Sequence, residues 1–229
     1  MANNPIVNMF RVKEIRGRVF FTLIVLAVFR LGSVLTIPGI NPEALTTYFR
    51  SATGASNSFV DYMDFFAGGA FSNFSVFMLG VMPYISTQII LQLALIIFPS
   101  LKRIAQEDGG QKKIQSWTRI GTVFVCLIQS LAVTVYASSI PGAVVISSDI
   151  MFKIIAMIAV TTGTMVTIWL GEQITARGIG NGISMLIFAG IVARLPSAVW
   201  ELGRLVSEDM SKLVSVIVVL IMFVGIVIL

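Results

Sequence analysis

Six long apolar runs divide the chain, and each has the length that an α-helix needs to cross a membrane. Proline, glycine or charged residues mark their boundaries, as they commonly mark helix ends. About 20 mostly apolar residues span the hydrocarbon core of a bilayer. The pattern therefore predicts an all-α, polytopic bundle of six transmembrane helices. The runs are Val19–Ile37, Phe74–Phe98, Arg119–Ser138, Ile150–Leu170, Ile183–Trp200 and Leu213–Leu229.

A shorter apolar segment, Phe65–Asn73 (FFAGGAFSN), directly precedes the second run and is called the glycine-rich segment below. About nine residues rise only about 14 Å as a helix, half the thickness of the hydrocarbon core. Irregular backbone at membrane depth is tolerated only where protein buries it or water reaches it. The segment could fold back and line a cavity, or lie on the outer surface as an amphipathic turn. The residues alone leave both arrangements open.

Composition and charge agree with a membrane protein. Of the 229 residues, 56% are hydrophobic and 12% are charged, whereas soluble domains carry about 25% charged residues. The net charge is +5, but in a membrane protein the positions of the cations matter more than their sum. Alternating the sides of the runs places ten Lys and Arg residues on one side and four on the other. This bias predicts a cytoplasmic N-terminus and a cytoplasmic QEDGGQKK loop.

The sequence offers little for catalysis or metal binding. It has no histidine, and its one cysteine, Cys126, lies in the third run, where we expect a small buried hydrophobe. No Asp or Glu lies within the six runs, whereas ion-coupled transporters generally need an intramembrane carboxylate. We therefore expect no enzyme, no metal and no cofactor. A passive channel is favoured, and a secondary transporter with broken helices is the alternative.

A second glycine-rich stretch, Gly171–Ser184 (GEQITARGIGNGIS), joins the fourth and fifth runs. It does not fit the dinucleotide-binding pattern GxGxxG, because Ile183 occupies the position of the last glycine. The favoured interpretation is a tight connection between helices, in which glycines supply positive φ angles.

Each glycine-rich stretch leads into a helix that carries branched apolar residues four positions apart. These are Val81 and Ile85 in the second run, and Ile183 and Ile187 in the fifth. Residues at this spacing share one helix face. Such pairs usually serve packing or lipid contact. They would also suit a narrow apolar collar, since hydrophobic constrictions block ions by dewetting.

Few polar side chains lie inside the runs. We expect Arg30 to extend to the membrane surface rather than to pair inside the bundle. Gln92 and Gln129 lie in the second and third runs, where hydrogen bonding between helices is their expected role.

Three stretches resemble the SecY family, the large subunit of the bacterial protein-conducting translocon. They are FFAGGAFSNFSVFMLGVMPYIS, GGQKKIQSWTRIGT and WLGEQITARGIGNGISMLIFAGIVARLP, and the likeness runs from about Arg11 to the end of the chain. The resemblance implies a passive conduit for secretory and membrane polypeptides in the bacterial plasma membrane, with lateral release into lipid. It also implies partners: small subunits of the SecE and SecG type, a motor ATPase of the SecA type, the ribosome, and polypeptides that bear signal sequences. It implies no direct contact with nucleic acid.

The resemblance also assigns roles to residues. The segment Asp61–Asn73 matches the plug, a short helix that closes the channel from the outer side. The second and third runs match one side of the lateral gate, with Gln92 and Gln129 as candidates. The pore ring is matched by Val81, where isoleucine is usual, and by Ile85, Ile183 and Ile187. The plug residues singled out are Phe65, Phe66, Ala67, Gly68, Gly69, Ala70, Phe71, Ser72 and Asn73.

The family has ten spans, and this chain stops in what corresponds to the sixth. We therefore expect a cytoplasmic segment over residues 1–18, the N-terminal half of a channel over 19–200, and an outer loop with the start of the sixth span over 201–229. Because a pore needs both halves, we expect the chain to be the front part of a longer protein.

Overall fold

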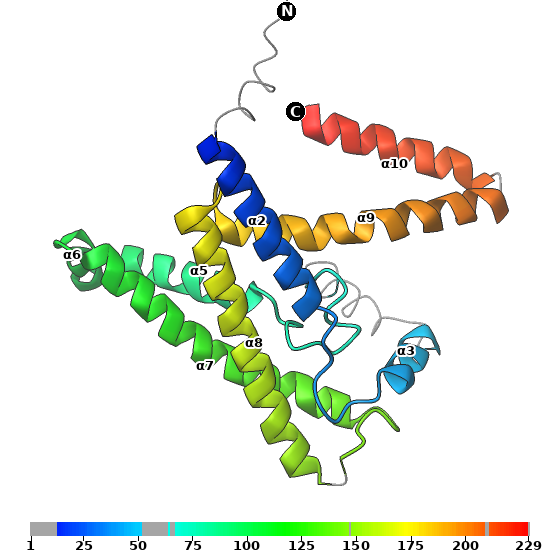
Figure 1. Cartoon of the computed structure of the whole chain (residues 1–229), viewed down its shortest axis with the longest axis horizontal. Helices are drawn as coiled ribbons and strands as arrows, with labels where there is room; N and C mark the ends of the chain where they lie inside the picture. Colours follow the sequence, from blue (N-terminus) through cyan, green and yellow to red (C-terminus); the bar gives the residue numbers. More distant parts are fainter. Residues whose placement is uncertain (1–12, 52–63, 65–66, 147, 209–210, 229) are drawn as a thin grey trace, which may run out of the picture.

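The computed structural model describes residues 13–51, 64, 67–146, 148–208 and 211–228 (Figure 1). Its regular elements in these ranges are α-helices, so the predicted all-α class is confirmed. The helices are α2 (Lys13–Gly32), α3 (Pro42–Ser51), α5 (Met82–Ile97), α6 (Pro99–Gln106), α7 (Gly110–Ser138), α8 (Asp149–Arg177), α9 (Gly182–Glu208) and α10 (Ser211–Ile228).

Several of these helices can cross a membrane. In the described part of the chain, α7, α8 and the Gly182–Arg204 part of α9 are long and apolar enough. Together α5 and α6 would make a fourth span, but they are bent by 106° at the break between them. Phe98 is extended there because the following Pro99 disfavours helical backbone at the residue before it. The chain is therefore a multi-pass membrane protein, and the number of six spans stays a prediction.

Two predicted spans differ from the observed helices at their ends. The first helix ends at Gly32 instead of Ile37, and the second begins at Met82 instead of Phe74. The backbone between these helices is used for pairing: the Ile37 N–H donates to the Phe74 carbonyl at 2.9 Å, and the Val76 N–H donates to the Leu35 carbonyl at 2.8 Å. This pairing between distant parts of the sequence replaces helical hydrogen bonds, and apolar composition alone does not distinguish the two.

Other helices extend beyond their apolar runs. Helix α7 begins at Gly110, α8 continues to Arg177, and α9 continues through Pro196 to Glu208. Polar residues at these ends are compatible with helix but not with the hydrocarbon core. The apolar pattern therefore located the membrane part of each helix and missed its polar extension.

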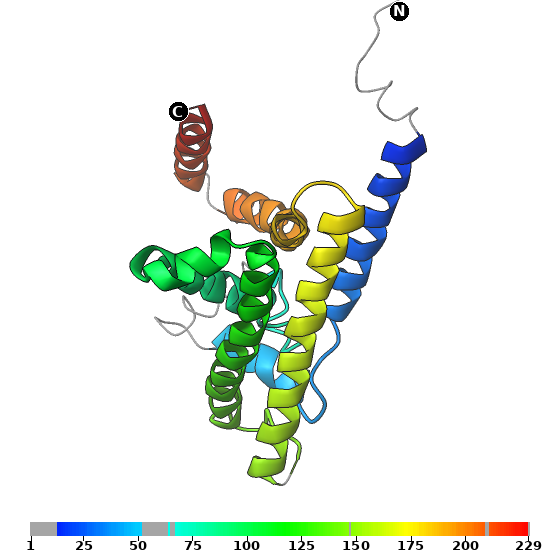
Figure 2. The same cartoon turned by 90° about the vertical axis from the view of Figure 1, so that its left-hand side faces the viewer.

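Helices α2 and α8 lie side by side, and α7 packs against both α5 and α8 (Figures 1 and 2). Helix α9 crosses this group at a steep angle near the C-terminal end of α8, and α10 packs against α9. Described residues of the segment between α2 and α5, such as Ile37, Phe71 and Phe74, form a core with residues of α7 and α8. Cys126 is fully buried in this core, as predicted.

Close contact between α8 and the Phe74–Val81 segment depends on Gly163. A Cβ atom added there would lie 2.1 Å from the Val76 carbonyl oxygen. Side chains at this position would force the segment away from α8, because 2.1 Å is far inside van der Waals contact. The glycine thus sets the distance between a spanning helix and the non-helical backbone beside it.

Replacing Gly163 with Ala should destabilise the protein by about 1–3 kcal/mol, the usual cost of overpacking. Gly17 in α2 is the matched control, since nothing lies within 4 Å of an added Cβ there. Gly17→Ala should be neutral or stabilising by about 0.5–1 kcal/mol, because alanine favours helix over glycine. Thermal unfolding in detergent measures both. Equal melting temperatures for the two variants would contradict the close contact.

Candidate functional site: an apolar collar, a polar cavity and the glycine-rich segment

The four residues of the predicted collar come together in space. Val81 immediately precedes α5 and is buried, while Ile85 of α5 and Ile183 and Ile187 of α9 are half-buried. All four belong to or pack against one hydrophobic cluster, whose other members include Phe29, Phe77, Leu170 and Leu186. The two pairs, about 100 positions apart in the sequence, therefore share one apolar cluster.

Glycines let the start of α9 reach this position. A Cβ added to Gly182 would lie 1.8 Å from the Gly171 carbonyl oxygen of α8, and one added to Gly178 would lie 2.5 Å from the Thr22 hydroxyl of α2. Gly180 has φ of +69°, which favours glycine. The predicted tight connection is confirmed, but it is limited to residues 178–181, because α8 continues to Arg177 and α9 begins at Gly182.

Asn181 completes this connection by capping α9. Its side-chain oxygen accepts hydrogen bonds from the Ile183 N–H at 3.0 Å and the Ser184 N–H at 3.3 Å. These are among the N–H groups that a helix start leaves without partners. The cap therefore fixes the direction in which α9 presents Ile183.

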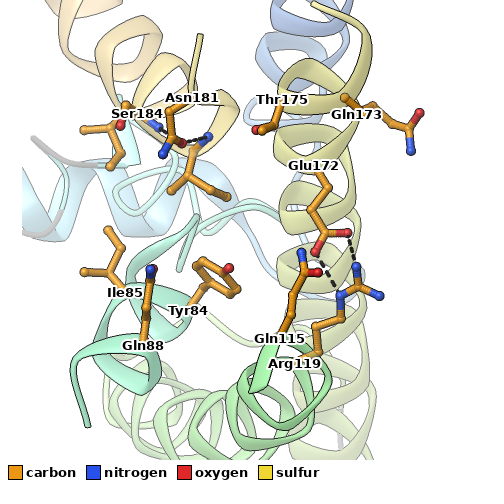
Figure 3. A pocket seen from close by; sticks show the side chains of 13 residues that line it. Tyr84, Ile85, Gln88, Gln115, Arg119, Glu172, Gln173, Thr175, Asn181 and Ser184 are labelled. Atoms are coloured by element: carbon orange, nitrogen blue, oxygen red, sulfur yellow. Dashed lines mark hydrogen bonds and ion pairs between the residues drawn. The ribbon is translucent and has the colours of Figure 1, made fainter. Parts of the chain in front are cut away.

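A cavity of about 660 Å³ opens beside the collar, between α5, α7, α8 and the start of α9 (Figure 3). Ile85, Ile183 and Ile187 form part of its wall. The rest of the wall is mostly polar, so the cavity suits water or a hydrated chain and meets apolar surface only at the collar. These other residues include Tyr84, Gln88, Gln115, Arg119, Glu172, Gln173, Thr175, Asn181 and Ser184.

An ion pair fixes one side of the cavity. Arg119 of α7 donates from Nε and Nη2 to the two carboxylate oxygens of Glu172 on α8, both at 2.8 Å (Figure 3). This two-point geometry orients both groups. No sequence pattern predicts this pair, because 53 residues separate the two side chains and Arg119 lies at the boundary of an apolar run.

One face of α9 connects the collar with the glycine-rich segment. Ile183, Ile187, Gly190 and Arg194 follow each other at spacings of four, three and four residues, which places them on the same face. A Cβ added to Gly68 would lie 2.8 Å from Gly190 Cα and 2.9 Å from its carbonyl oxygen. The segment therefore contacts α9 about one turn beyond the collar residue Ile187.

The described part of the glycine-rich segment, Ala67–Asn73, is folded into the protein. Ala67, Ala70 and Phe71 are buried in the core formed with α7 and α8. The alternative of an amphipathic turn on the outer surface is therefore wrong for these residues. Phe65 and Phe66, and the residues 61–63 of the predicted plug, lie outside the described residues.

The backbone of this segment differs from the predicted short helix. Ala67 is helical, but the residues from Gly68 to Asn73 form successive turns. Gly68 and Gly69 have φ of +63° and +92°, which side chains disfavour. The glycine pair thus ends the helix and reverses the chain.

Two arginines hold the segment. Arg30 of α2 donates from Nη1 to the Gly68 carbonyl oxygen at 2.6 Å, and Arg194 of α9 forms an ion pair with Asp64. The expectation that Arg30 extends to the membrane surface is therefore wrong, because a backbone carbonyl inside the protein binds its guanidinium. Sequence reasoning missed Asp64 and Arg194. The available signal was an arginine in an apolar run, which usually needs a partner at membrane depth.

The two glutamines lie on neighbouring helices without forming the expected bond. Gln92 is exposed on α5, and Gln129 is half-buried on α7. Within the part of the chain that the structure describes, neither amide has a hydrogen-bond partner, so hydrogen bonding between helices is not their role there. Their assignment to a lateral gate stays a prediction.

Comparison with known proteins gives relatives for most of the chain. Residues 75–229 match the family model described as SecY. "Protein translocase subunit SecY" of Borreliella burgdorferi is 46% identical over 214 residues, which is 93% of this chain and 49% of that protein. The protein of the same name from Escherichia coli (strain K12) is 43% identical over 189 residues, 81% of this chain and 42% of that protein. The chain thus spans about half the length of the curated relatives it matches.

Solved structures agree at the level of the fold. "The structure of a protein conducting channel" matches with a TM-score of 0.59 at 20% identity, covering 93% of this chain and 48% of that chain. "Sec61 in the Canine ribosome-channel complex from the endoplasmic reticulum" matches with the same TM-score of 0.59 at 19% identity, covering 93% and 48%.

Proposed function

The chain belongs to the SecY family, and we propose from this that it forms about half of a channel that conducts polypeptides across and into a membrane. The observation that carries the proposal is the meeting of the four collar residues beside a polar cavity. A conduit needs both parts: a wet entrance and a narrow apolar constriction. The substrates are secretory and membrane polypeptides that bear signal sequences.

The collar seals the pore and still lets a chain pass. Branched apolar side chains do not hydrate a passing ion, so a narrow ring of them dewets and blocks conduction. They also offer no fixed hydrogen bonds, so a polypeptide can slide past without being held. On this proposal Val81, Ile85, Ile183 and Ile187 are one part of the pore ring, and the other half of the channel supplies the rest.

The glycine-rich segment is the plug in this proposal. Its contact with α9 lies next to Ile187 on the same helix face, which supports a position directly beyond the collar. The absence of a side chain at Gly68 lets the segment approach the α9 backbone closely, and its turns allow it to leave without unwinding a spanning helix. Signal sequences would displace it by intercalating at α5 and α7, which together match one side of the lateral gate and carry Gln92 and Gln129.

The environment and partners follow from family membership. We propose the bacterial plasma membrane, with the N-terminus cytoplasmic as the distribution of Lys and Arg predicts. The proposed partners are subunits of the SecE and SecG type, a SecA-type motor and the ribosome. The chain itself performs no chemistry, and lateral release into lipid completes the path of membrane segments.

The transporter alternative receives no support from the comparisons, which match channel subunits and channel structures. The charged residues found inside the protein also have structural partners: Asp64 is paired with Arg194, and Glu172 with Arg119. Both carboxylates are therefore paired with an arginine, whereas coupled ion transport would use an unpaired one.

Replacing Ile85 or Ile183 with Ser should raise the resting ion conductance of the complete channel by about an order of magnitude, because a hydroxyl wets the constriction. Conductance is measured with purified channel in planar bilayers. Ile90→Ser is the matched control, since Ile90 lies on the same helix with 59% of its surface exposed. Equal conductance of the Ile85→Ser, Ile183→Ser and Ile90→Ser channels would refute the collar.

Replacing Gly68 with Ala should also cause a leak, by displacing the plug from α9. Gly69→Ala is the control, because both glycines have positive φ and share the backbone strain. Only at Gly68 does an added Cβ meet backbone, 2.8 Å from Gly190 Cα; at Gly69 the nearest atom is Arg194 Nε at 3.8 Å. The Gly68→Ala channel should therefore conduct several-fold more at rest, as about 1–3 kcal/mol of overpacking implies. If Gly69→Ala leaks as much, the contact with α9 does not seat the plug.

A further inference from the structure

Three charged side chains surround the glycine-rich segment and belong to three different parts of the chain. Asp64 lies just before the segment, Arg30 lies near the end of α2, and Arg194 lies on α9. Only 3% of the Asp64 side-chain surface is exposed, compared with 34% for Arg194. A buried carboxylate needs both hydrogen bonds and a cation, since burial removes its hydration. This group is called the latch below.

Asp64 is fixed to the segment itself. Its Oδ1 accepts hydrogen bonds from the Phe71 and Ser72 N–H groups, each at 3.0 Å, and its Oδ2 accepts one from the Ser72 hydroxyl at 2.6 Å. These bonds close the turns from Gly68 to Ser72 around the carboxylate. Asp64 therefore moves with the segment as a unit.

Arg194 and Arg30 connect that unit to two separate helices. The Arg194 guanidinium donates from Nη2 to Asp64 Oδ2, so the carboxylate joins the segment to α9. Arg30 donates to the Gly68 carbonyl, and its position is fixed by Ser33, whose hydroxyl accepts from Arg30 Nη1 at 3.3 Å and donates to the Arg30 carbonyl at 2.7 Å. The segment is thus bound to α2 on one side and to α9 on the other.

We propose that Asp64, Arg30 and Arg194 form a latch that holds the plug closed and makes its release depend on a movement of α9 away from α2. The proposal rests on the proposed function, in which the glycine-rich segment is the plug. When α9 moves, the segment cannot keep both contacts, so either the Arg194 ion pair or the Arg30 hydrogen bond must break.

The latch also links the plug to the collar. Arg194 shares one face of α9 with Ile183 and Ile187, so a displacement of α9 that widens the collar acts on Asp64 at the same time. Opening the constriction and releasing the plug are therefore one event, driven by the same helix. Arg30 and Arg194 are positioning residues in this event, because neither needs to touch the passing chain.

The two partners of the ion pair should not respond equally to substitution. Arg194→Gln leaves a buried carboxylate without its cation, which is costly. Asp64→Asn keeps an oxygen that can accept the Phe71 and Ser72 N–H bonds, and the partly exposed Arg194 can turn to water. In the complete channel, we expect Arg194→Gln to raise the resting conductance about tenfold or more over that of the unchanged channel, and Asp64→Asn to raise it less.

The double variant is the decisive measurement. Once Asp64 is neutral, loss of Arg194 costs little, so Asp64→Asn with Arg194→Gln should conduct less than Arg194→Gln alone. Lys153→Gln is the matched control, because it removes one cation and the exposed ion pair with Asp149 on α8, and it should leave conductance unchanged. If the effects of the two latch substitutions on conductance simply add, the proposal is overturned. The effects of substitutions at independent sites add, whereas those at coupled sites do not.

A second readout keeps the test valid if a variant assembles poorly. In a Cys126→Ala background, Ala70→Cys places a thiol at a fully buried plug position. A membrane-impermeant maleimide should label it slowly in the otherwise unchanged channel and about tenfold faster with Arg194→Gln, while Arg194→Lys, which keeps the charge, should lie between. Equal labelling rates in all three would overturn the latch.

The failure of the latch and the failure of the channel proposal give different results. If the chain forms no such channel, Ile85→Ser leaves conductance unchanged together with the latch variants. If the channel exists but the latch does not, Ile85→Ser leaks while Arg194→Gln behaves like Lys153→Gln.

Discussion

Backbone polar groups at membrane depth must find hydrogen-bond partners within the protein, because lipid offers none. In the described residues between α2 and α5, non-helical backbone finds such partners at two places. Leu35 and Ile37 pair with Val76 and Phe74 through their backbones. In the turns at 68–72, the Asp64 carboxylate accepts hydrogen bonds from backbone N–H groups, and the Arg30 guanidinium donates one to a backbone carbonyl. Without these partners the non-helical backbone could not lie inside the bundle.

Compensation of this kind needs backbones to approach closely, and glycine makes that possible. Gly163 admits the Val76 carbonyl beside α8, Gly182 admits the start of α9 beside Gly171, and Gly68 meets Gly190. In each case a single methyl group would separate the two backbones. The glycines therefore do more than make turns: they determine how near the collar and the glycine-rich segment come to the helices that hold them.

Much of this arrangement could be predicted from the sequence, because it depends on local patterns. Apolar runs located the long helices, and spacing of four residues placed Ile183 and Ile187 on one face. The glycine-rich stretch before α9 was recognisable as a connection. What could not be predicted depends on distant pairs: Arg194 and Asp64 are 130 residues apart, and Arg30 and Gly68 are 38 apart. Hydropathy indicates whether a residue tolerates lipid, but it does not indicate which residue inside the protein will form an ion pair or hydrogen bond with it.

Because Ile187 and Arg194 share one face of α9, mutation during evolution can alter this helix only in certain ways. Each residue advances a helix by about 100°, so inserting or deleting one residue between Ile187 and Arg194 would turn the arginine far from Asp64 while Ile187 stayed in place. Apart from Gly190, whose backbone meets Gly68, residues in this interval can be substituted without turning Arg194 away, whereas a change of length turns it. The separation of seven residues from Ile187 to Arg194 is therefore fixed. Any homologue that keeps both the collar and the ion pair must keep this spacing along α9.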